Sequence, residues 1–406
     1  MKVVQINAVS GKGSTGKICE NVSKLLNAEN IDNEILYASG KTAYSHSIKC
    51  ADDKYIKIQA LKSRVFGNNG FNSDAVTKRL IKELESFNPD IIQLHNLHGH
   101  NCNLNILFKY FKNKNKKIIW TFHDCWAFTA YCPHFTLVGC EKWKMECKEC
   151  PQLKGVSWFF DKSTSIYNKK KELFSGLDLT IVTPSEWLAG LVKQSFLKDY
   201  PVKVINNGID LNVFKPTESD FRKKYNISDN KYILLGVAFG WGKRKGLDVF
   251  IELQKRLDKD KYQIVLVGTD DNVDKLLPKE IISIHRTQNQ TELAEIYTVA
   301  DLFVNPTREE NYPTVNMESI ACGTPVITFR TGGSPEMLTE KTGMVVDCDD
   351  IDSLQHGIEK ICEQNLFSTA DCIEQAKQFD ISKRFQEYVD LYKFIIKGTR
   401  NLGYYG

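Results

Sequence analysis

The chain has 406 residues, of which 42% are hydrophobic and 26% are charged, and its formal net charge is +4 at pH 7. This composition is that of a soluble globular protein and excludes a disordered chain, while the length suits two domains of about 200 residues each. The longest apolar runs have the length of strands, so we expect neither a membrane-spanning helix nor a signal peptide.

The cysteines and the charge distribution bear on compartment and partners. Twelve cysteines without a secretory signal are expected as reduced thiols or metal ligands, with the cytoplasm as compartment. Residues 1–205 carry 29 basic and 19 acidic residues, a net of +10, whereas the rest of the chain carries 25 and 31, a net of −6. The basic half suits an anionic membrane at the inner face of the cell or a pyrophosphate-linked acceptor; a merely solvated lysine-rich surface is an equal alternative. No nucleic-acid-binding pattern is present.

In chain order, strand-like apolar segments alternate with helix-like segments throughout. The first half predicts strands at 3–8, 34–38, 90–96, 117–124, 179–185 and 202–206, and helices from about Gly16 and near 74–87 and 104–112. The second half predicts strands at 232–240, 262–268, 301–306, 325–329 and 343–347, and helices from Gly246, at 291–299, from Thr314 and over about 369–398. The apolar runs are continuous, as in parallel strands covered by helices on both faces. The pattern predicts an α/β protein with two doubly wound, Rossmann-like domains.

A turn-rich step at 206–210 marks the domain boundary. We expect a first domain at 1–205 with a Cys-rich insertion at about 125–160, a second domain at 206–380, and a C-terminal helix at 381–406. The apolar residues expected to pack these last helices are Phe379, Phe385, Tyr388, Leu391 and Phe394.

Residues 310–336 contain the densest set of site-building features. The Pro313–Thr314 step predicts a helix start capped by Thr314, so that Glu310 lies in the preceding loop and Glu318 lies about one turn into the helix. A helix N-terminus attracts anions, and two carboxylates beside it suit a ligand with both phosphate and hydroxyl groups. The alternative is a pair of ordinary solvated carboxylates.

A glycine pair at 332–333 follows the next strand and precedes a second helix start at 334–336. Two helix entries on adjacent loops would form a nucleotide-sugar pocket more readily than a core.

Two further loops carry phosphate-binding features. Gly11, Gly13 and Gly16 fit G-x-G-x-x-G after the first strand, but Glu34 precedes its strand where a dinucleotide site needs an acid at the strand end. In the second domain, Arg244 and Lys245 follow the first strand and could neutralise a pyrophosphate; a solvated basic turn is the alternative.

Together these segments resemble the retaining glycosyltransferases of family 4 (group 1), which have the GT-B fold. The resemblance spans nearly the whole chain and includes residues 207–210 as the interdomain linker. It implies an acceptor-side first domain and a nucleotide-sugar-binding second domain facing a central cleft, with the last helix crossing back to the first domain. It also implies a nucleoside diphosphate sugar as donor, retention of configuration and no catalytic metal or other cofactor.

The resemblance assigns roles to individual residues. The catalytic residues that it implies are Glu310, His123 and Lys245. The donor-binding residues that it implies are Glu318, Arg244, Lys245, Gly13, Gly16, Asn311, Thr314 and Gly333. Glu318 would hold the ribose hydroxyls, Glu310 would approach the sugar, and His123 at a strand end would face it. The arginine usual in the family is missing, since Phe239 or Gly240 stands in its place, and Arg244 is the expected substitute.

The insertion carries four cysteines in the spacing C-x7-C-x6-C-x2-C, namely Cys132, Cys140, Cys147 and Cys150. Four thiolates suit a tetrahedral structural Zn²⁺, and an insertion so polar and aromatic is expected to have little core of its own. Cys125 and His134 are alternative ligands, and unliganded thiols or disulfides remain alternatives to zinc.

The same insertion resembles the subgroup that makes capsule, colanic-acid-like or O-antigen polysaccharide. The acceptor would then be a lipid-pyrophosphate-linked saccharide, with His95 and His98 as hypothetical acceptor contacts. Two other functions share the fold: a nucleotide-sugar 2-epimerase and a non-catalytic sugar-binding subunit. A metal-dependent transferase of the other common fold is disfavoured, because Asp270-Asp271 lacks the D-x-D spacing.

Overall fold

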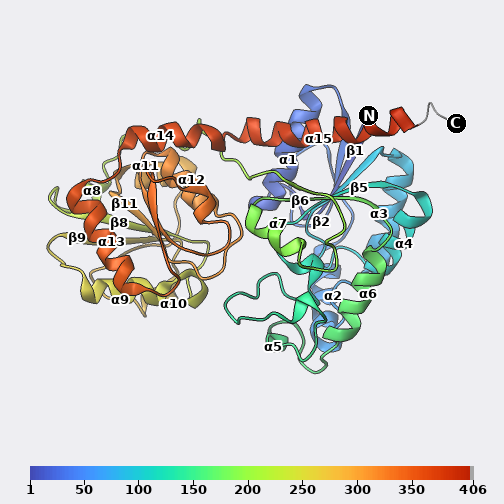
Figure 1. Cartoon of the computed structure of the whole chain (residues 1–406), viewed down its shortest axis with the longest axis horizontal. Coiled ribbons are helices and arrows are strands. Elements are labelled where there is room, and N and C mark those ends of the chain that lie inside the picture. Colours follow the sequence, from blue (N-terminus) through green and yellow to red (C-terminus); the bar gives the residue numbers. More distant parts are fainter. Residues whose placement is uncertain (403–406) are drawn as a thin grey trace. The chain divides into compact units, whose positions relative to one another are not determined.

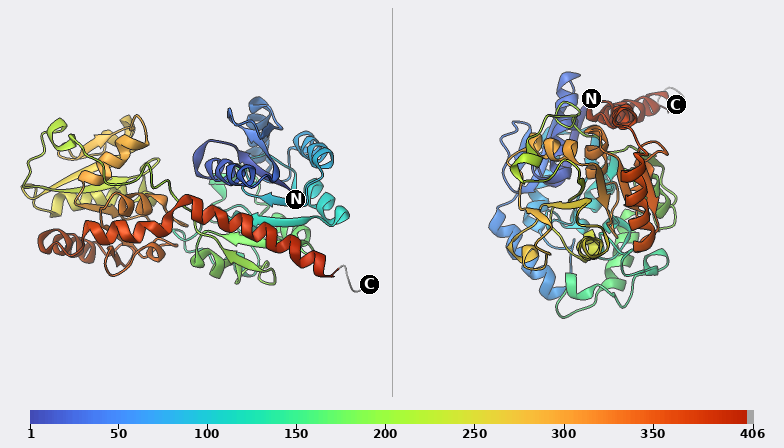
Figure 2. Two further views of the ribbon diagram at one scale, coloured as in Figure 1. Left: turned by 90° about the horizontal axis from the view of Figure 1, so that it is seen from above. Right: turned by 90° about the vertical axis from the view of Figure 1, so that its left-hand side faces the viewer.

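The computed structural model describes residues 1–402, which form two compact units (Figure 1). Unit 1 comprises Met1–Ile205 and the C-terminal helix from Phe385 onward, and unit 2 comprises Asn206–Arg384. Each unit contains one parallel sheet with helices packed against it (Figure 2).

The sheet of unit 1 has seven strands in the order β3-β2-β1-β4-β5-β6-β7, and all neighbours are parallel. The strands are β1 (Lys2–Val9), β2 (Asp32–Ser39), β3 (Ser47–Lys49), β4 (Ile91–Leu94), β5 (Lys117–Thr121), β6 (Asp178–Thr183) and β7 (Val202–Val204). The helices are α1 (Gly13–Ala28), α2 (Asp53–Phe66), α3 (Asp74–Phe87), α4 (Leu104–Lys114), α5 (Leu153–Val156), α6 (Ser163–Phe174) and α7 (Glu186–Val192), with 3-10 turns η1 (Trp126–Phe128) and η2 (Lys142–Lys144). The order reverses between β1 and β4, and ligands of such sheets bind at the carboxyl ends of the strands beside the reversal.

The sheet of unit 2 has six parallel strands in the order β10-β9-β8-β11-β12-β13. The strands are β8 (Tyr232–Val237), β9 (Tyr262–Val267), β10 (Ile282–Ile284), β11 (Leu302–Asn305), β12 (Val326–Phe329) and β13 (Gly343–Val346). The helices are α8 (Phe221–Lys224), α9 (Leu247–Arg256), α10 (Asp271–Asp274), α11 (Gln290–Val299), α12 (Thr314–Ala321), α13 (Ile351–Gln364), α14 (Thr369–Ala376) and α15 (Ile381–Leu402), which continues into unit 1. The 3-10 turns are η3 (Lys243–Lys245), η4 (Pro335–Met337) and η5 (Lys377–Phe379). Here the order reverses between β8 and β11.

The predicted fold class is confirmed, since both units are doubly wound parallel sheets and every predicted strand is present. All residues of β4, β11 and β12 are buried, which explains their continuous apolar runs. The sequence prediction placed the start of α1 three residues too late, and it missed two strands and seven helices, namely β3, β10, α2, α5, α6, α7, α8, α10 and α13. Among the helices within residues 1–402, none combines the length and the apolar character needed to span a bilayer.

Helix α15 packs on unit 1 through one face. Its buried residues follow the i, i+3, i+4, i+7 spacing and are Phe385, Tyr388, Val389 and Tyr392. The hydroxyl of Tyr392 donates a hydrogen bond to Oε1 of Gln93 on β4, in the interior of unit 1. The expectation for Phe394 was wrong, because this side chain is 73% exposed. It lies about 200° around the helix from Tyr392 and therefore faces away from the core.

We expect Tyr392→Phe to lower the free energy of unfolding by about 1–3 kcal/mol, because Gln93 Oε1 would lose a donor in a buried position. Phe394→Ala on the same helix is the control and should change it by less than about 0.5 kcal/mol. Urea unfolding of both variants measures the difference. Equal losses would contradict the packing of α15 described above.

Candidate active site

One candidate site lies in unit 2, in the loops that follow β8 and β11. These strands are neighbours on the two sides of the point where the strand order reverses. The first loop ends in η3 with Lys245, and the second carries Glu310 ahead of α12. Lys245 Nζ donates a hydrogen bond to Glu310 Oε2, and the two side chains are 20% and 19% exposed. The structure thus joins two predicted catalytic residues in one half-buried ion pair.

Backbone contacts hold the two loops against each other. The Arg308 amide donates to the carbonyl of Arg244 at 2.9 Å, and Arg244 Nη1 donates to the carbonyl of Glu309 at 3.4 Å. Gly246 has φ +76°, and a Cβ there would lie 2.4 Å from the carbonyl oxygen of Pro306. Only glycine permits this backbone and this approach, so the loops cannot separate without losing these contacts.

The glycine turn after β12 presses directly on the Glu310 loop. Gly332 has φ +56°, and a Cβ there would lie 1.8 Å from the carbonyl oxygen of Glu310. The Gly333 amide donates to the carbonyl of Asn311 at 2.8 Å. The predicted adjacency of the two glycine-bounded loops is therefore present, and Gly332 and Gly333 set the backbone that carries Glu310.

Arg308 is a central residue that the sequence analysis missed. Its guanidinium donates two hydrogen bonds to Asp248 at 2.8 Å, one to Asp349 at 2.7 Å and one to the carbonyl of Lys243 at 2.5 Å. The hydrogen bonds from Arg308 hold the pKa of Asp248 below its usual value. Arg308 is 8% exposed, so it is a buried cation that ties the β11 loop to η3, to α9 and to the loop after β13.

Helix α12 begins at Thr314, and the residue in its N-cap position is Pro313, without a side-chain cap hydrogen bond. The predicted capping role of Thr314 is therefore wrong, because Thr314 is already the first helical residue. Glu318 lies in the second turn and accepts a hydrogen bond from the Tyr297 hydroxyl at 3.1 Å. Burial raises the pKa of Tyr297 well above its ordinary value, so its hydroxyl remains a donor that orients Glu318.

A network of buried side-chain hydrogen bonds joins α12 to the neighbouring strands. Asn305 Nδ2 donates to Asn316 Oδ1 at 2.8 Å, and Asn316 Nδ2 donates to Ser334 Oγ at 2.7 Å. Ser334 Oγ in turn lies 2.8 Å from Thr328 Oγ1. These contacts tie the glycine turn and η4 to α12 and to β11 and β12. The sequence analysis did not find Asn316, since one asparagine in a helix carries no signal of its partners.

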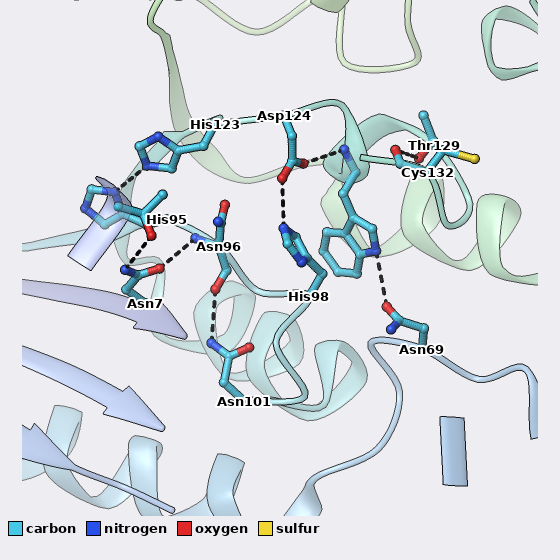
Figure 3. Close-up of polar contacts among 12 residues, drawn as sticks. Asn7, Asn69, His95, Asn96, His98, Asn101, His123, Asp124, Thr129 and Cys132 are labelled. Carbon is cyan, nitrogen blue, oxygen red and sulfur yellow. Dashed lines mark hydrogen bonds and ion pairs between the residues drawn. The ribbon is translucent and has the colours of Figure 1, made fainter. Parts of the chain in front are cut away.

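A second candidate site lies in unit 1 at the carboxyl ends of β1, β4 and β5 (Figure 3). Gln5 Nε2 donates to the carbonyl of Cys19 at 2.9 Å, so Gln5 Oε1 faces His95 Nε2 at 3.2 Å. His95 Nε2 must then carry the proton, and Nδ1 accepts a hydrogen bond from His123 Nε2 at 3.0 Å. In neutral His123 this arrangement makes Nδ1 the acceptor nitrogen.

Both histidines are neutral near pH 7. Burial lowers the pKa of His123 to about 4, against the opposing charge of Asp124, and lowers that of His95 well below its ordinary value. His123 is therefore suited to accept a hydrogen bond and to orient a ligand, and unsuited to act as an acid at neutral pH.

A second polar pair, His98 and Asp124, lies beyond His95 and His123 in the loops that follow β4 and β5. His98 Nε2 lies 2.8 Å from Asp124 Oδ2, and Asp124 Oδ1 accepts from the Trp126 amide at 2.9 Å. Burial alone would raise the pKa of Asp124, but the charge and the hydrogen bond of His98 hold it below its usual value. Lys170, which the sequence analysis missed, is fully buried with Nζ 3.4 Å from the Trp126 ring centroid. It donates to the carbonyls of Trp126, Thr129 and Ala130 and so anchors the start of the insertion.

The glycine loop after β1 opens α1 as predicted. Gly13 has φ +67° and begins the helix, while a Cβ on Gly16 would lie 3.0 Å from the amide nitrogen of Gly11. Asn7 joins this loop to the end of β4, because its Nδ2 donates to Thr15 Oγ1 at 3.3 Å and its Oδ1 accepts from the Asn96 amide at 3.2 Å.

The four predicted zinc ligands lie in one insertion and are free of disulfides, and a hydrogen bond joins the thiols of Cys132 and Cys150. Among residues 1–402, only Asp271, Asp274 and His285, all exposed, bring three metal-binding atoms within 4.8 Å of one another. No three of the four cysteine sulfurs therefore lie within 4.8 Å of one another.

The buried rings of the insertion belong to the core of unit 1, in agreement with the expectation that the insertion has little core of its own. Phe128, Phe135 and Trp143 belong to one buried cluster with residues of the strands of unit 1, and Tyr131 is buried against α6. These contacts anchor the insertion to unit 1, and zinc at the four cysteines stays a prediction.

Comparisons with known proteins agree with this architecture. The family described as Glycosyltransferase Family 4 matches residues 17–213, and the family described as Glycosyl transferases group 1 matches residues 217–379. The two matches together account for most of the sequence. The chain therefore belongs to the family 4, group 1 glycosyltransferases.

Particular relatives refine the comparison. The putative colanic acid biosynthesis glycosyl transferase WcaC of Escherichia coli K12 is 23% identical over 97% of this chain and 100% of its own length. The N,N'-diacetylbacillosaminyl-diphospho-undecaprenol alpha-1,3-N-acetylgalactosaminyltransferase of Campylobacter jejuni is 29% identical over 50% of this chain and 57% of its own length. The structure of Anabaena Alr3699/HepE in complex with UDP-glucose superposes with a TM-score of 0.69 at 13% identity, covering 97% of this chain and 99% of that one. This likeness shows that the fold is GT-B.

The neutral histidines predict a pH dependence of stability. In the unfolded chain His123 is protonated below about pH 6.5, whereas in the native state it is protonated only below about pH 4. The free energy of unfolding therefore decreases as the pH falls from about 6.5 to about 4. Between pH 7 and pH 5 we expect the wild type to lose up to about 2 kcal/mol more than His123→Gln. The exposed His356→Gln is the control and should follow the wild type in urea unfolding at both pH values. Parallel losses in all three proteins would contradict the buried neutral state.

Proposed function

We propose that this glycosyltransferase transfers a sugar, with retention of configuration, from a nucleoside diphosphate sugar to a lipid-diphosphate-linked saccharide in bacterial surface polysaccharide synthesis. The Lys245–Glu310 pair, positioned by two glycine-bounded loops, is the observation that carries the donor part. The acceptor part is supported by the similarity to WcaC and to the Campylobacter transferase, whose names state colanic acid biosynthesis and a diphospho-undecaprenol acceptor.

The charges of the site suit a diphosphate leaving group. Arg244 and Lys245 lie in η3, and α12 presents its N-terminus after the Glu310 loop. Cations and helix N-terminal amides stabilise negative charge as it develops on departing phosphate. The proposal therefore assigns the diphosphate to Arg244, Lys245 and the amides around Asn311, Thr314 and Gly333, with no divalent metal in catalysis.

The ion pair suggests how donor binding prepares the sugar site. Without donor, Glu310 neutralises Lys245. An incoming diphosphate competes for Lys245, and Glu310 is then released to accept hydrogen bonds from sugar hydroxyls. Glu318, oriented by Tyr297, accepts hydrogen bonds from the ribose hydroxyls.

The remaining roles come from the family resemblance. His123, with Nδ1 as acceptor, orients the donor sugar, and Gly13 and Gly16 let the backbone approach the diphosphate. The acceptor hydroxyl attacks from the face that the diphosphate leaves, and the departing phosphate oxygen takes its proton, which gives retention without a protein nucleophile.

Two measurements test this function. Thermal shifts against uridine, guanosine, adenosine and thymidine diphosphate sugars identify the donor, because a ligand of the native state raises the melting temperature. Transfer to a polyprenyl-diphosphate saccharide is then followed by NMR, with the donor anomeric configuration expected in the product and activity expected to survive EDTA. Inversion, loss of activity with EDTA, or conversion of donor without acceptor would overturn the corresponding part of the proposal.

The two carboxylates have separable effects. We expect Glu318→Ala to weaken donor binding about 10- to 100-fold through the lost charged hydrogen bonds. Glu310→Gln should lower kcat about 100-fold with donor affinity kept or improved, because Lys245 no longer has a competing partner. Calorimetric titration with the donor and steady-state kinetics separate the two effects, and the exposed Glu340→Ala serves as control. Equal effects of the two variants on binding and turnover would contradict the assigned roles.

We also propose a structural zinc ion at Cys132, Cys140, Cys147 and Cys150. Their partial exposure and common insertion leave the thiolates accessible to zinc, which would draw them together. We expect about one zinc per chain by elemental analysis, with Cys132→Ser losing it. Cys348→Ser, an exposed cysteine of unit 2, should keep it. Metal-free protein in which a thiol reagent titrates all four cysteines would contradict the proposal.

A further inference from the structure

Unit 1 exposes six large apolar side chains on two segments. Ile58, Leu61 and Phe66 on the outer face of α2 are 52%, 53% and 49% exposed. Residues 158–160 of the insertion, Trp158, Phe159 and Phe160, are 52%, 69% and 50% exposed. The opposite face of α2 packs into the core through Ile56, Gln59 and Ser63, so the exposed face has no packing role in the unit.

The two segments form one surface. The Trp158 amide donates to the carbonyl of Arg64 at the end of α2 at 2.7 Å. A Cβ on Gly67 would lie 2.6 Å from the carbonyl oxygen of Phe160. Tyr131, buried beneath, donates to the carbonyl of Gly67 at 2.9 Å. These contacts hold the aromatic loop against the helix end, near α5 and α2 in Figure 1.

Most of the exposed charged residues around these apolar side chains are basic. The exposed basic residues of the two segments are Lys54, Lys57, Lys62, Arg64, Lys154 and Lys162. The acids of these segments are engaged locally. Asp52 caps α2 by accepting from the Lys54 amide, Asp53 pairs with Lys49, and Asp161 accepts from the amides of Cys150 and Ser163. The surface therefore combines an apolar, aromatic centre with a basic margin.

We propose that the outer face of α2 and residues 158–160 form a docking face for an anionic lipid bilayer. Aromatic rings settle at the bilayer interface, an amphipathic helix buries its apolar face there, and basic residues attract anionic headgroups. A second copy of the chain would bring the basic margins together and be repelled. The proposal rests on the lipid-linked acceptor of the proposed function.

The helix of the docking face contacts the loop that carries His98, which is an expected acceptor contact. Trp126 Nε1 donates to Asn69 Oδ1 at 3.2 Å, just beyond α2. Ser63 Oγ on α2 lies 3.3 Å from His100 Nδ1, two residues after His98. The loop that carries His98 thus packs on the inner face of the same helix whose outer face meets the bilayer, about one helix diameter away.

The test is sedimentation of the full chain with phosphatidylcholine vesicles, with or without phosphatidylglycerol. We expect binding to anionic vesicles that weakens with salt, and little binding to neutral ones. Replacing Trp158, Phe159 and Phe160 by serine should lower the partition coefficient at least about 10-fold. Charge reversal at Lys57 and Lys62 should lower it about 30-fold at low salt and less at high salt.

The matched controls lie on unit 2, where Leu276→Ser and Lys275→Glu change one exposed apolar and one exposed basic residue. Both should bind vesicles like the wild type. The donor-induced thermal shift is measured on every variant, and its preservation shows an intact fold and donor site independently of docking. Wild-type protein that ignores anionic vesicles, or variants that bind like the wild type, would overturn the docking face even where donor binding holds. Light scattering that shows a dimer lost on serine substitution would overturn it in favour of a second copy.

Discussion

The buried guanidinium of Arg308 is the interaction on which the donor side of this protein depends. A cation taken out of water is costly unless its donors are satisfied, and here two aspartates and a backbone carbonyl satisfy them. Because the partners lie on η3, α9 and the loop after β13, the requirement to keep Arg308 paired fixes three segments at once. Lys245 lies on η3 and Glu310 lies on the same loop as Arg308, so these contacts hold both members of the ion pair. Gly332, which follows β12, packs against the carbonyl of Glu310.

In unit 1, the buried polar groups that satisfy one another are neutral side chains. A series of hydrogen bonds runs from the Cys19 carbonyl through Gln5 and His95 to His123. It fixes which ring nitrogen of each histidine carries the proton, because each group has only one arrangement that satisfies its neighbour. Lys170 anchors the start of the insertion through three backbone carbonyls, and buried rings of the insertion pack into the core of unit 1. The insertion can therefore hold Trp158, Phe159 and Phe160 outward on an ordered base, which flexible loops could not do.

Part of this organisation is legible in the residues alone. Continuous apolar runs such as those of β4 and β12 predict parallel, doubly covered strands, because a strand buried on both faces has no polar side. The close spacing of Glu310, Glu318 and the glycine pair at 332–333 locates the site, because one strand–loop–helix unit holds them all. The family resemblance added roles for individual residues, and those roles remain predictions.

What the sequence by itself determined was thus the fold class, the strands other than β3 and β10, and the neighbourhood of the site, all of which depend on short-range patterns. Only the tertiary structure decided the partners of Arg308, Asn316 and Lys170, since these side chains bond to residues brought close by sheet order rather than by spacing. It also decided that Phe394 faces outward and that Thr314 begins its helix, because helix phase and starting point follow from packing at the ends. Which α2 residues stay exposed was likewise settled by the core beneath them, since exposure is a property of the assembled unit.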